Sequence, residues 1–363
     1  MATIHELETP VAVVDLDVLE RNIARMADWA KRHGVRLRPH AKTHKAPAIG
    51  RLQLAAGASG LSLAKAGEAE VFADAGFDDI FIAYPSVGAD KARRLLALAD
   101  RIRLAVGVDS ADGAATLAQA FAAAGRRLEV LLKIDVGYGR VGVAPEAAVE
   151  LAGRIADLPG LRLRGVFTHA GHSYFGETPD AVAAIGAAEG RILVEAAAAI
   201  RSAGLTADEV SVGSTPTARA VMSSHGVTEC RPGNYVFHDA SQVSLGTCSI
   251  DDCALSVLST VVSAPAPGRA FLDAGSKTLS SDPLRPLPGG YGWLLGTPSR
   301  LKGLSEEHGW IEAGAGDAFR VGQRVRVLPN HACVVANLHD RLIAVRGERV
   351  EGEIEVSARG RVR

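Results

Sequence analysis

The chain has 363 residues, of which 47% are hydrophobic and 22% are charged, and its formal net charge at pH 7 is −1. This length is enough for a sizeable core and more than one domain, and the near-neutral charge gives no electrostatic case for a nucleic-acid or membrane partner. The sequence has neither a run of 18 apolar residues nor a signal-peptide pattern, so a soluble cytoplasmic protein is expected. The four cysteines are too few for a disulfide framework, which also favours a reducing compartment.

The first two thirds of the chain alternate between short β-branched runs and alanine-rich helical stretches. Eight strand candidates cover residues 36–40, 60–64, 79–85, 101–109, 128–135, 163–169, 209–214 and 228–237. Helix candidates between them include residues 65–76, 89–100, 111–125 and 145–159. This alternation indicates parallel strands joined by right-handed crossovers, and eight such strands over about 200–250 residues predict a (β/α)8 TIM barrel in an α/β fold. An open, doubly wound sheet is the alternative.

The pattern changes after about residue 245, where helical periodicity ends. Short strand candidates separated by proline and glycine turns follow at residues 254–264, 269–275, 323–329, 333–338 and 341–347. A second, mostly β domain is therefore predicted. We place the barrel at residues 14–245 and the second domain at residues 246–363 together with about residues 1–13, because the early apolar run 11–16 suits either part.

Polar residues follow five of the predicted barrel strands at the point where each strand ends. The segments are PHAKTHK (39–45), KIDVGYGRVG (133–142), FTHAGHSY (167–174), VGSTPT (212–217) and RPGNY (231–235). Because the carboxyl ends of the strands in such a barrel meet on one rim, where active sites lie, we expect these segments to converge.

Each of these features has an ordinary structural explanation when it is taken alone. A lysine near a strand end, such as Lys42, usually lies on the surface, and Arg140 has Asp135 close in sequence as an ion-pair partner. A histidine that ends an apolar strand, such as His169, is usually buried in the core, and the turn at 213–217 also suits a simple helix start. Together they favour a phosphate site after the seventh and eighth strands with a lysine amine opposite, an arrangement suited to pyridoxal phosphate held as a Schiff base.

Seven segments of the chain, read in order, resemble the fold-type III pyridoxal-phosphate enzymes. They are TPVAVVDLDVLERNIARM, RPHAKTHK, DVGYGRVG, FTHAGHSY, GSTPT, RPGNYVFHD and LPNHACVVANLHD, and they span nearly the whole chain. Within these enzymes the chain is similar to the D-threonine aldolase and D-serine dehydratase group, which is related to alanine racemase. The resemblance implies an alanine racemase-like barrel, a β domain similar to that of D-serine dehydratase, and a homodimer.

The resemblance implies roles for individual residues around the cofactor. Lys42 matches the lysine that forms the Schiff base, whereas Lys45 does not. We expect Arg38, His40 and Lys45 to favour the neutral amine of Lys42 if they lie close to it. The other implied positions are Arg140 at the phenolic oxygen, His169 stacked on the ring, Gly213, Ser214, Thr215, Gly233 and Asn234 around the phosphate, and Arg231 near the pyridine nitrogen.

The segment PNHAC supplies a candidate metal site. His331 and Cys333 form an H-x-C pair that we expect on a strand, with both side chains on the same face, and imidazole with thiolate suits zinc. In the group that the chain resembles, dehydratases carry H-x-C here, whereas aldolases carry H-x-D, which suits manganese or magnesium. Tyr174 matches a tyrosine in the dehydratases' loop. Phe175 stands near the position of the aldolases' catalytic histidine, which leaves His172 as the candidate base.

These parts predict a lyase that depends on pyridoxal phosphate and a divalent metal and acts on D-β-hydroxy amino acids. A dehydratase of the D-serine or 3-hydroxy-D-aspartate type is favoured, with Lys42 removing the α-proton and the metal assisting the departing hydroxide. A D-threonine aldolase, which releases glycine and an aldehyde, is the alternative. A racemase is disfavoured because no matching tyrosine motif follows residue 245. A cofactor-binding protein without catalysis is disfavoured by the presence of the second domain.

Overall fold

The first domain is a closed parallel barrel. The computed structural model describes residues 2–286 and 289–363. Eight strands form one parallel sheet with the order β2-β9-β8-β7-β6-β5-β4-β3. They are β2 (Arg36–Leu37), β3 (Leu61–Leu63), β4 (Asp79–Pro85), β5 (Arg103–Val108), β6 (Leu128–Lys133), β7 (Leu161–Phe167), β8 (Glu209–Val212) and β9 (Glu229–Cys230). A parallel bridge between His40 and Ser62 joins the two edges of the sheet. The predicted barrel is confirmed, and the open, doubly wound sheet is excluded.

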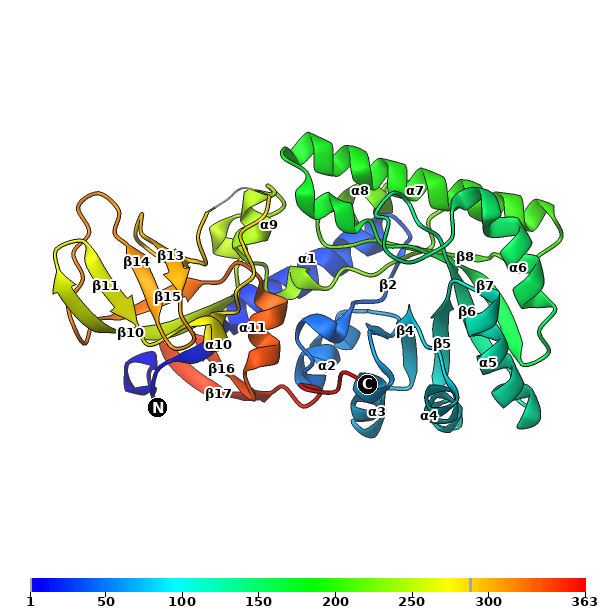
Figure 1. Cartoon of the computed structure of the whole chain (residues 1–363), viewed down its shortest axis with the longest axis horizontal. Coiled ribbons are helices and arrows are strands. Elements are labelled where there is room, and N and C mark those ends of the chain that lie inside the picture. Colours follow the sequence, from blue (N-terminus) through cyan, green and yellow to red (C-terminus); the bar gives the residue numbers. More distant parts are fainter. Residues whose placement is uncertain (1, 287–288) are drawn as a thin grey trace.

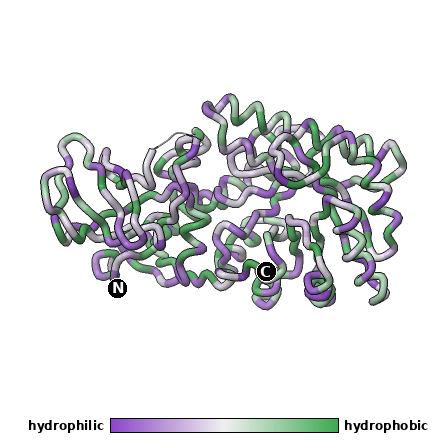
Figure 2. The backbone as a smooth tube through the Cα atoms, in the orientation of Figure 1, coloured by the Kyte–Doolittle hydropathy of each residue, from purple (hydrophilic) through white to green (hydrophobic). Residues whose placement is uncertain are grey.

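Helices follow the strands along the chain and cover the outside of the barrel (Figure 1). They are α1 (Leu16–Arg32), α2 (Pro47–Ala55), α3 (Ala66–Asp74), α4 (Ala89–Ala99), α5 (Ala111–Ala123), α6 (Ala148–Ala156), α7 (Pro179–Ser202) and α8 (Ala218–Met222). Side-chain N-caps fix some of the helix starts. At the N-terminus of α5, for example, the Ser110 hydroxyl accepts a hydrogen bond from the Gly113 N–H. Figure 2 shows hydrophobic and hydrophilic residues mixed along these helices, as expected for helices that bury one face.

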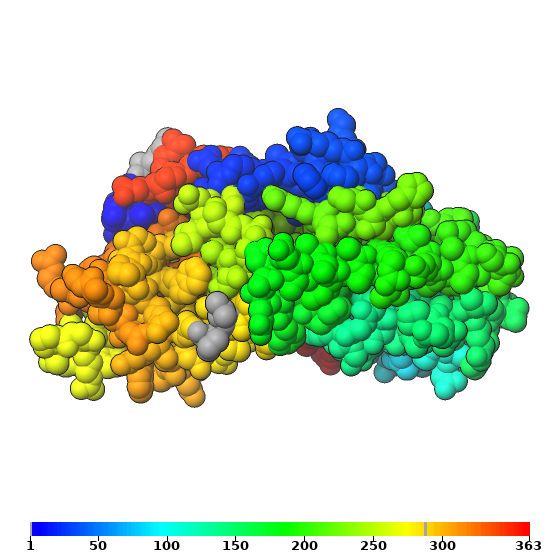
Figure 3. All heavy atoms as spheres, turned by 90° about the horizontal axis from the view of Figure 1, so that it is seen from above, coloured from blue at the N-terminus to red at the C-terminus, as the bar shows by residue number. Residues whose placement is uncertain are grey.

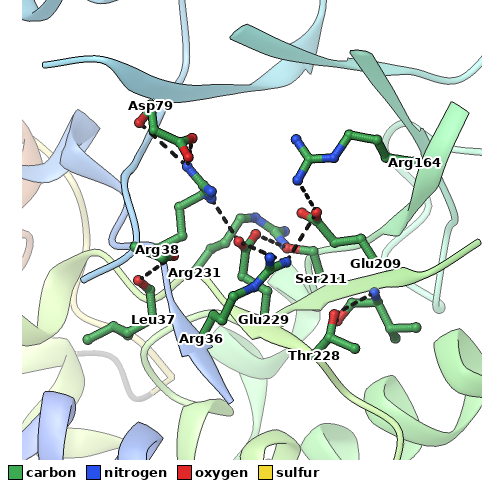
Figure 4. A network of polar contacts seen from close by, with 12 residues as sticks. Arg36, Leu37, Arg38, Asp79, Arg164, Glu209, Ser211, Thr228, Glu229 and Arg231 are labelled. Carbon is green, nitrogen blue, oxygen red and sulfur yellow. Dashed lines mark hydrogen bonds and ion pairs between the residues drawn. The ribbon is translucent and has the colours of Figure 1, made fainter. Parts of the chain in front are cut away.

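The end of the barrel where the strands begin is closed by charged side chains (Figure 4). Arg38 donates from Nε to Glu229 Oε2 at 2.8 Å and from Nη1 to Asp79 Oδ1 at 2.6 Å. Asp79 and Glu229 are the first residues of β4 and β9. Catalytic groups are therefore expected at the opposite end, where the strands finish.

The second domain is built on a nine-stranded sheet with the order β11-β14-β13-β12-β15-β10-β1-β16-β17. Its strands are β1 (Val11–Asp15), β10 (Leu255–Ala266), β11 (Arg269–Leu272), β12 (Trp293–Leu294), β13 (Arg300–Leu304), β14 (Gly309–Glu312), β15 (Arg324–Leu328), β16 (Arg341–Arg346) and β17 (Arg349–Glu355). By pairing with β10 and β16, β1 belongs to this sheet although it opens the chain. Figure 3 shows the first residues, in blue, against the last strands, in red. The predicted domain boundary at residues 245 and 246 stays a prediction.

One segment differs from its prediction. Residues 333–338, expected as a strand, lie in the helix α11 (Ala332–Leu338). The short helix α9 (Ala240–Ser244) lies just before the predicted domain boundary, and the short helix α10 (Ser276–Leu279) lies in the second domain. The run of apolar residues in CVVANL suits either structure, and the burial of Ala332, Val335 and Ala336 on one face favours the helix.

The two domains meet where the barrel strands end. α11 packs against η2 (Ala41–Thr43), the short helix that carries Lys42. Lys45 Nζ donates to Asn337 Oδ1 at 2.7 Å, and the Ala358 N–H donates to the Lys45 carbonyl oxygen at 3.0 Å. Within the described ranges, no helix combines the length and the apolar character that crossing a membrane requires.

Candidate active site

A cavity of about 850 Å³ lies at the junction of the two domains. Residues that follow the barrel strands line it together with residues of the second domain. The predicted residues on its wall are Lys42, Arg140, His169, Tyr174, Gly213, Ser214, Thr215, Arg231, Gly233, Asn234, His331 and Cys333. His172 is the predicted site residue that does not line it. Five strand ends and one loop of the second domain therefore converge, as the sequence predicts.

Lys42 reaches the cavity from η2, directly after β2. Its backbone N–H faces His40 Nδ1 at 3.4 Å, which fixes the start of the short helix. Burial lowers the pKa of Lys42, and Arg140 and Arg231 act in the same direction, while Cys333 and Glu68 oppose them. A neutral amine is therefore favoured at the position where a nucleophile or a base is needed.

The sources of this pKa shift differ from the expected ones. Arg38 points toward the opposite end of the barrel and pairs with Asp79 and Glu229. Lys45 forms an ion pair with Glu68, whose Oε1 lies 3.3 Å from the Lys45 Nζ. The positive charges that lower the pKa of the Lys42 amine come from Arg140 and Arg231, which are distant in sequence. Arg38 therefore does not meet the condition of lying close to Lys42, whereas His40 does interact with it, and the direction of the shift is as predicted.

A cradle of small residues follows β8 and β9. Gly213 has a φ of +103°, and a Cβ built on it would lie 2.6 Å from Cys230 Sγ. A Cβ on Gly233 would lie 2.7 Å from Thr43 Oγ1, so side chains are excluded at both positions. Ser214 and Thr215 lie between them on the cavity wall. Such a turn of backbone N–H groups and hydroxyls suits a phosphate.

Arg231 offers an unused donor beside this cradle. Its Nη1 donates to Ser211 Oγ at 2.5 Å, and its Nη2 donates to the Thr168 carbonyl oxygen. Its Nε is buried and has no hydrogen-bond partner among the described residues. A buried N–H group of this kind is costly unless a ligand accepts from it. The cradle, the free Lys42 amine and the Arg231 donor together fit pyridoxal phosphate.

Two buried residues of the site were not singled out from the sequence. Lys133, at the end of β6, lies 4.6 Å from the centre of the Phe167 ring, and burial followed by Arg231 and Arg140 lowers its pKa well below the usual value. Glu189 of α7 accepts from the N–H groups of Ala170 and Gly213, at 3.2 and 3.0 Å. Lys133 begins the segment 133–142, one of the polar strand ends that the sequence analysis identified. Glu189 lies within an alanine-rich helix, where no sequence pattern indicates a role in the site.

His331 and Cys333 lie at the N-terminus of α11. The expected strand is wrong, because His331 is the N-cap residue and Cys333 is in the first turn. The His331 ring nonetheless contacts the Cys333 thiol, and its Nδ1 lies 2.6 Å from Asp282 Oδ2. Burial alone would raise the pKa of Cys333, but His331 and the Thr43 hydroxyl outweigh it and lower that pKa.

This donor set fits one metal ion with open coordination positions. The thiolate and the imidazole are ligands that zinc prefers, and a metal-binding histidine usually donates its other ring N–H to a carboxylate, as His331 does to Asp282. Among residues 2–286 and 289–363, no group of three or more histidine, cysteine, aspartate or glutamate side chains is arranged to hold a metal. The remaining positions would fall to water or substrate.

The segment after β7 places Tyr174 and Phe175 on the cavity wall but not His172. Tyr174 lines the cavity, and burial together with Cys333 and Asp239 raises its pKa above the ordinary value. Phe175 also lines the cavity, and its phenyl ring cannot act as a base. The His172 ring lies 6.4 Å from that of Tyr138, centre to centre, and its buried Nδ1 has no hydrogen-bond partner among the residues that the structure describes.

Comparisons with known proteins agree with this architecture. The chain matches the alanine racemase N-terminal domain over residues 14–241 and the putative serine dehydratase domain over residues 254–345. It is 42% identical to D-threo-3-hydroxyaspartate dehydratase of Delftia sp. (strain HT23), over 91% of this chain and 92% of that protein. It is 37% identical to D-threonine aldolase of Arthrobacter sp., over 98% of this chain and 93% of that protein.

Solved structures give the same result. The structure of D-threonine aldolase from Filomicrobium marinum superposes with a TM-score of 0.93 at 36% identity, covering 99% of this chain and 97% of that one. The dehydratase from Delftia sp. HT23 gives a TM-score of 0.92 at 39% identity, covering 98% and 99%. The chain therefore belongs to the family of pyridoxal-phosphate-dependent lyases that joins an alanine racemase-like barrel to a serine dehydratase domain.

Proposed function

We propose that the protein is a metal-assisted dehydratase of D-β-hydroxy amino acids. The observation that carries this proposal is the His331–Cys333 pair on the wall of the cavity that also holds Lys42. When bound, pyridoxal phosphate supplies a sink for the electron pair left at the substrate Cα. A divalent metal on the two side chains would supply Lewis acidity for the β-hydroxyl group.

Lys42 is the group that we assign to the cofactor and to the proton of the substrate. Its lowered pKa favours the neutral amine, which is the form that attaches to an aldehyde and accepts a proton. Arg231 is assigned to the ring nitrogen because its buried Nε has no hydrogen-bond partner within the described part of the chain. His169 and Arg140 line the same wall and are assigned to the ring face and the phenolic oxygen.

Zinc is the metal we propose, with manganese or magnesium less suited to the site. A thiolate is a soft ligand, and sites for manganese or magnesium consist mainly of oxygen ligands. A cysteine-to-alanine mutant of a D-threo-3-hydroxyaspartate dehydratase has been solved in a metal-free form. The lowered pKa of Cys333 supports a thiolate ligand in this chain too.

The charge on the cavity wall favours a dicarboxylic substrate. Lys65 and Arg285 both line the cavity, and the charged group of each lies over an aromatic ring. The Lys65 ammonium lies 3.7 Å from the Tyr84 ring centre, and the Arg285 guanidinium lies 4.6 Å from that of Phe175. Arg285 also acts on the Asp282 carboxylate, whereas no ion pair involves Lys65 among the described residues, so Lys65 is the cation that a second substrate carboxylate would meet. We therefore rank 3-hydroxy-D-aspartate above D-serine.

The D-threonine aldolase reaction is the second candidate, because relatives of that activity cover nearly the whole chain. It requires a base that removes the proton of the β-hydroxyl group. Phe175 cannot act as a base, and His172 is not on the cavity wall. The dehydratase is favoured for this reason.

Product analysis tests the proposal. Holoenzyme supplied with metal is incubated with 3-hydroxy-D-aspartate, D-serine and D-threonine. We expect a keto acid and ammonia from each active substrate, and glycine with an aldehyde as the main products would contradict the dehydratase. Lys42→Ala and Lys45→Ala form a matched pair, since only the first should abolish the visible absorption of bound cofactor. A molar mass in solution of twice 37.8 kDa would support the homodimer that we also propose.

A further inference from the structure

A second cavity lies behind the phosphate cradle, away from the site described above. It has a volume of about 180 Å³, and its wall includes Thr215, Pro216, His238 and Cys248. Thr215 lines both cavities, so the cradle forms a wall between them. Neither Cys248 nor Cys253 lines the main cavity. The mechanism proposed above therefore makes no use of these two cysteines.

Cys248 and Cys253 stand on either side of the one-turn helix η6 (Ile250–Asp252). The turn brings their side chains into contact. Cys253 Sγ also lies 3.7 Å from the Ser249 carbonyl oxygen. Both side chains are partly exposed, so a small reagent can reach them.

The surroundings of Cys248 favour its thiolate. The Cys253 side chain and the His238 ring both contact Cys248, so the pKa of Cys248 lies below that of an ordinary thiol in spite of partial burial. His238 is held in a left-handed conformation with a φ of +49°, and it lines the same small cavity as Cys248. A low-pKa thiolate beside a second thiol is the arrangement of redox-active cysteine pairs.

We propose that Cys248 and Cys253 form a reversible disulfide when the protein meets hydrogen peroxide. The Cys248 thiolate attacks one peroxide oxygen, the O–O bond breaks, and hydroxide leaves, which gives a sulfenic acid. The Cys253 thiol then attacks the Cys248 sulfur, an S–S bond forms, and the oxygen leaves as water with both remaining protons. The two thiols lose two electrons, and the peroxide gains them.

This pair lies close to the loop that holds the cofactor cradle. His238 precedes Asp239, whose carboxylate accepts from Asn234 Nδ2 at 2.6 Å and from the Ala332 N–H at 2.9 Å. Asn234 lines the main cavity, and Ala332 lies between the two proposed metal ligands. A disulfide at this point would therefore lie beside His238, the residue that directly precedes Asp239 in the chain.

Peptide mapping tests the disulfide directly. Holoenzyme is treated with graded hydrogen peroxide, free thiols are alkylated, and the chain is cut before aspartate residues, which separates residues 239–250 from residues 252–272. We expect these two peptides to be linked after peroxide and separate after a reductant. If both cysteines remain alkylated at a peroxide dose that already oxidises Cys333, the proposal is wrong.

Two variants separate the roles of the thiols. Cys253→Ser should accumulate a sulfenic acid on Cys248 that dimedone traps, whereas Cys248→Ser should show no dimedone adduct on Cys253. Both variants should keep the activity of the reduced wild type, because neither residue lines the active-site cavity. A dimedone adduct on Cys253 in place of Cys248 would overturn the assignment of the attacking thiol.

Discussion

Asp282 Oδ2 lies 2.6 Å from His331 Nδ1, so a carboxylate from one loop of the second domain holds the imidazole that faces Cys333. The hydrogen bond and the charge of His331 lower the pKa of Asp282 despite partial burial. The contact leaves the other ring nitrogen of His331 for a ligand. It therefore sets both the orientation and the basicity of the proposed metal ligand.

Asp282→Asn should weaken metal binding without removing the cofactor. Loss of a carboxylate partner of this kind typically costs about 10–100-fold in metal affinity. We expect a dissociation constant raised by roughly that factor in competition with a metal-sensitive dye, and activity that excess zinc restores. Ser281→Ala, at the exposed neighbouring position, is the control and should leave the affinity unchanged.

Cys333→Asp should shift the metal preference from zinc toward manganese or magnesium, because a carboxylate is a harder ligand than a thiolate. The elimination rate should then fall more than any cleavage to glycine, since departure of hydroxide depends on the Lewis acid. Metal content and both product classes are measured on one substrate. Cys333→Ser provides the comparison, and an unchanged metal preference in the Asp variant would show that Cys333 is not a ligand.

Gly233→Ala should reduce cofactor affinity, because its new Cβ would lie 2.7 Å from Thr43 Oγ1 and 2.9 Å from the His40 carbonyl oxygen. The clash pushes the cradle away from the segment that carries Lys42. We expect faster loss of the visible absorption band on dialysis. Gly153→Ala in α6 is the matched control, since its Cβ meets nothing closer than 3.9 Å. Equal cofactor loss from both variants would contradict this role.

Glu229→Gln should destabilise the barrel. Glu229 is fully buried and accepts from Arg38 Nε at 2.8 Å and from Ser211 Oγ at 2.7 Å (Figure 4). Removing one partner of a buried ion pair costs about 3–5 kcal/mol, so the free energy of unfolding in urea should fall by that amount. Glu312→Gln breaks an exposed ion pair with Arg300 and should change the free energy of unfolding by less than about 0.5 kcal/mol.

Iodoacetamide should alkylate Cys248 at a rate whose midpoint pH is lower than that of an ordinary thiol. The thiolate is the nucleophile, and its fraction rises as the pH rises through the pKa, which here is lowered by Cys253 and His238. The half-maximal rate should therefore fall below the usual thiol value of about pH 8.5. Cys253→Ser should move it upward, and a wild-type midpoint at or above the usual value would contradict the contact.

The alternation of strand and helix, and the polar segments after five strands, were readable from the sequence because both depend on local patterns. Parallel strands place their carboxyl ends on one rim, so Lys42, His169 and Arg231 were predicted to converge before any contact was known. The choice of Lys42 over Lys45 came from the resemblance. The structure adds a physical reason, since Glu68 and Asn337 already hold Lys45.

Other features required the tertiary structure. β1 joins the second sheet through strands that follow it by more than 200 residues, and no local pattern encodes such a pairing. The helix at residues 332–338 replaces an expected strand, because packing against η2 decides between two structures that the same apolar run allows. The neutral amine of Lys42 likewise depends on burial and on two distant arginines. Local composition sets which elements form, whereas charge and burial at the site arise only when separate elements meet.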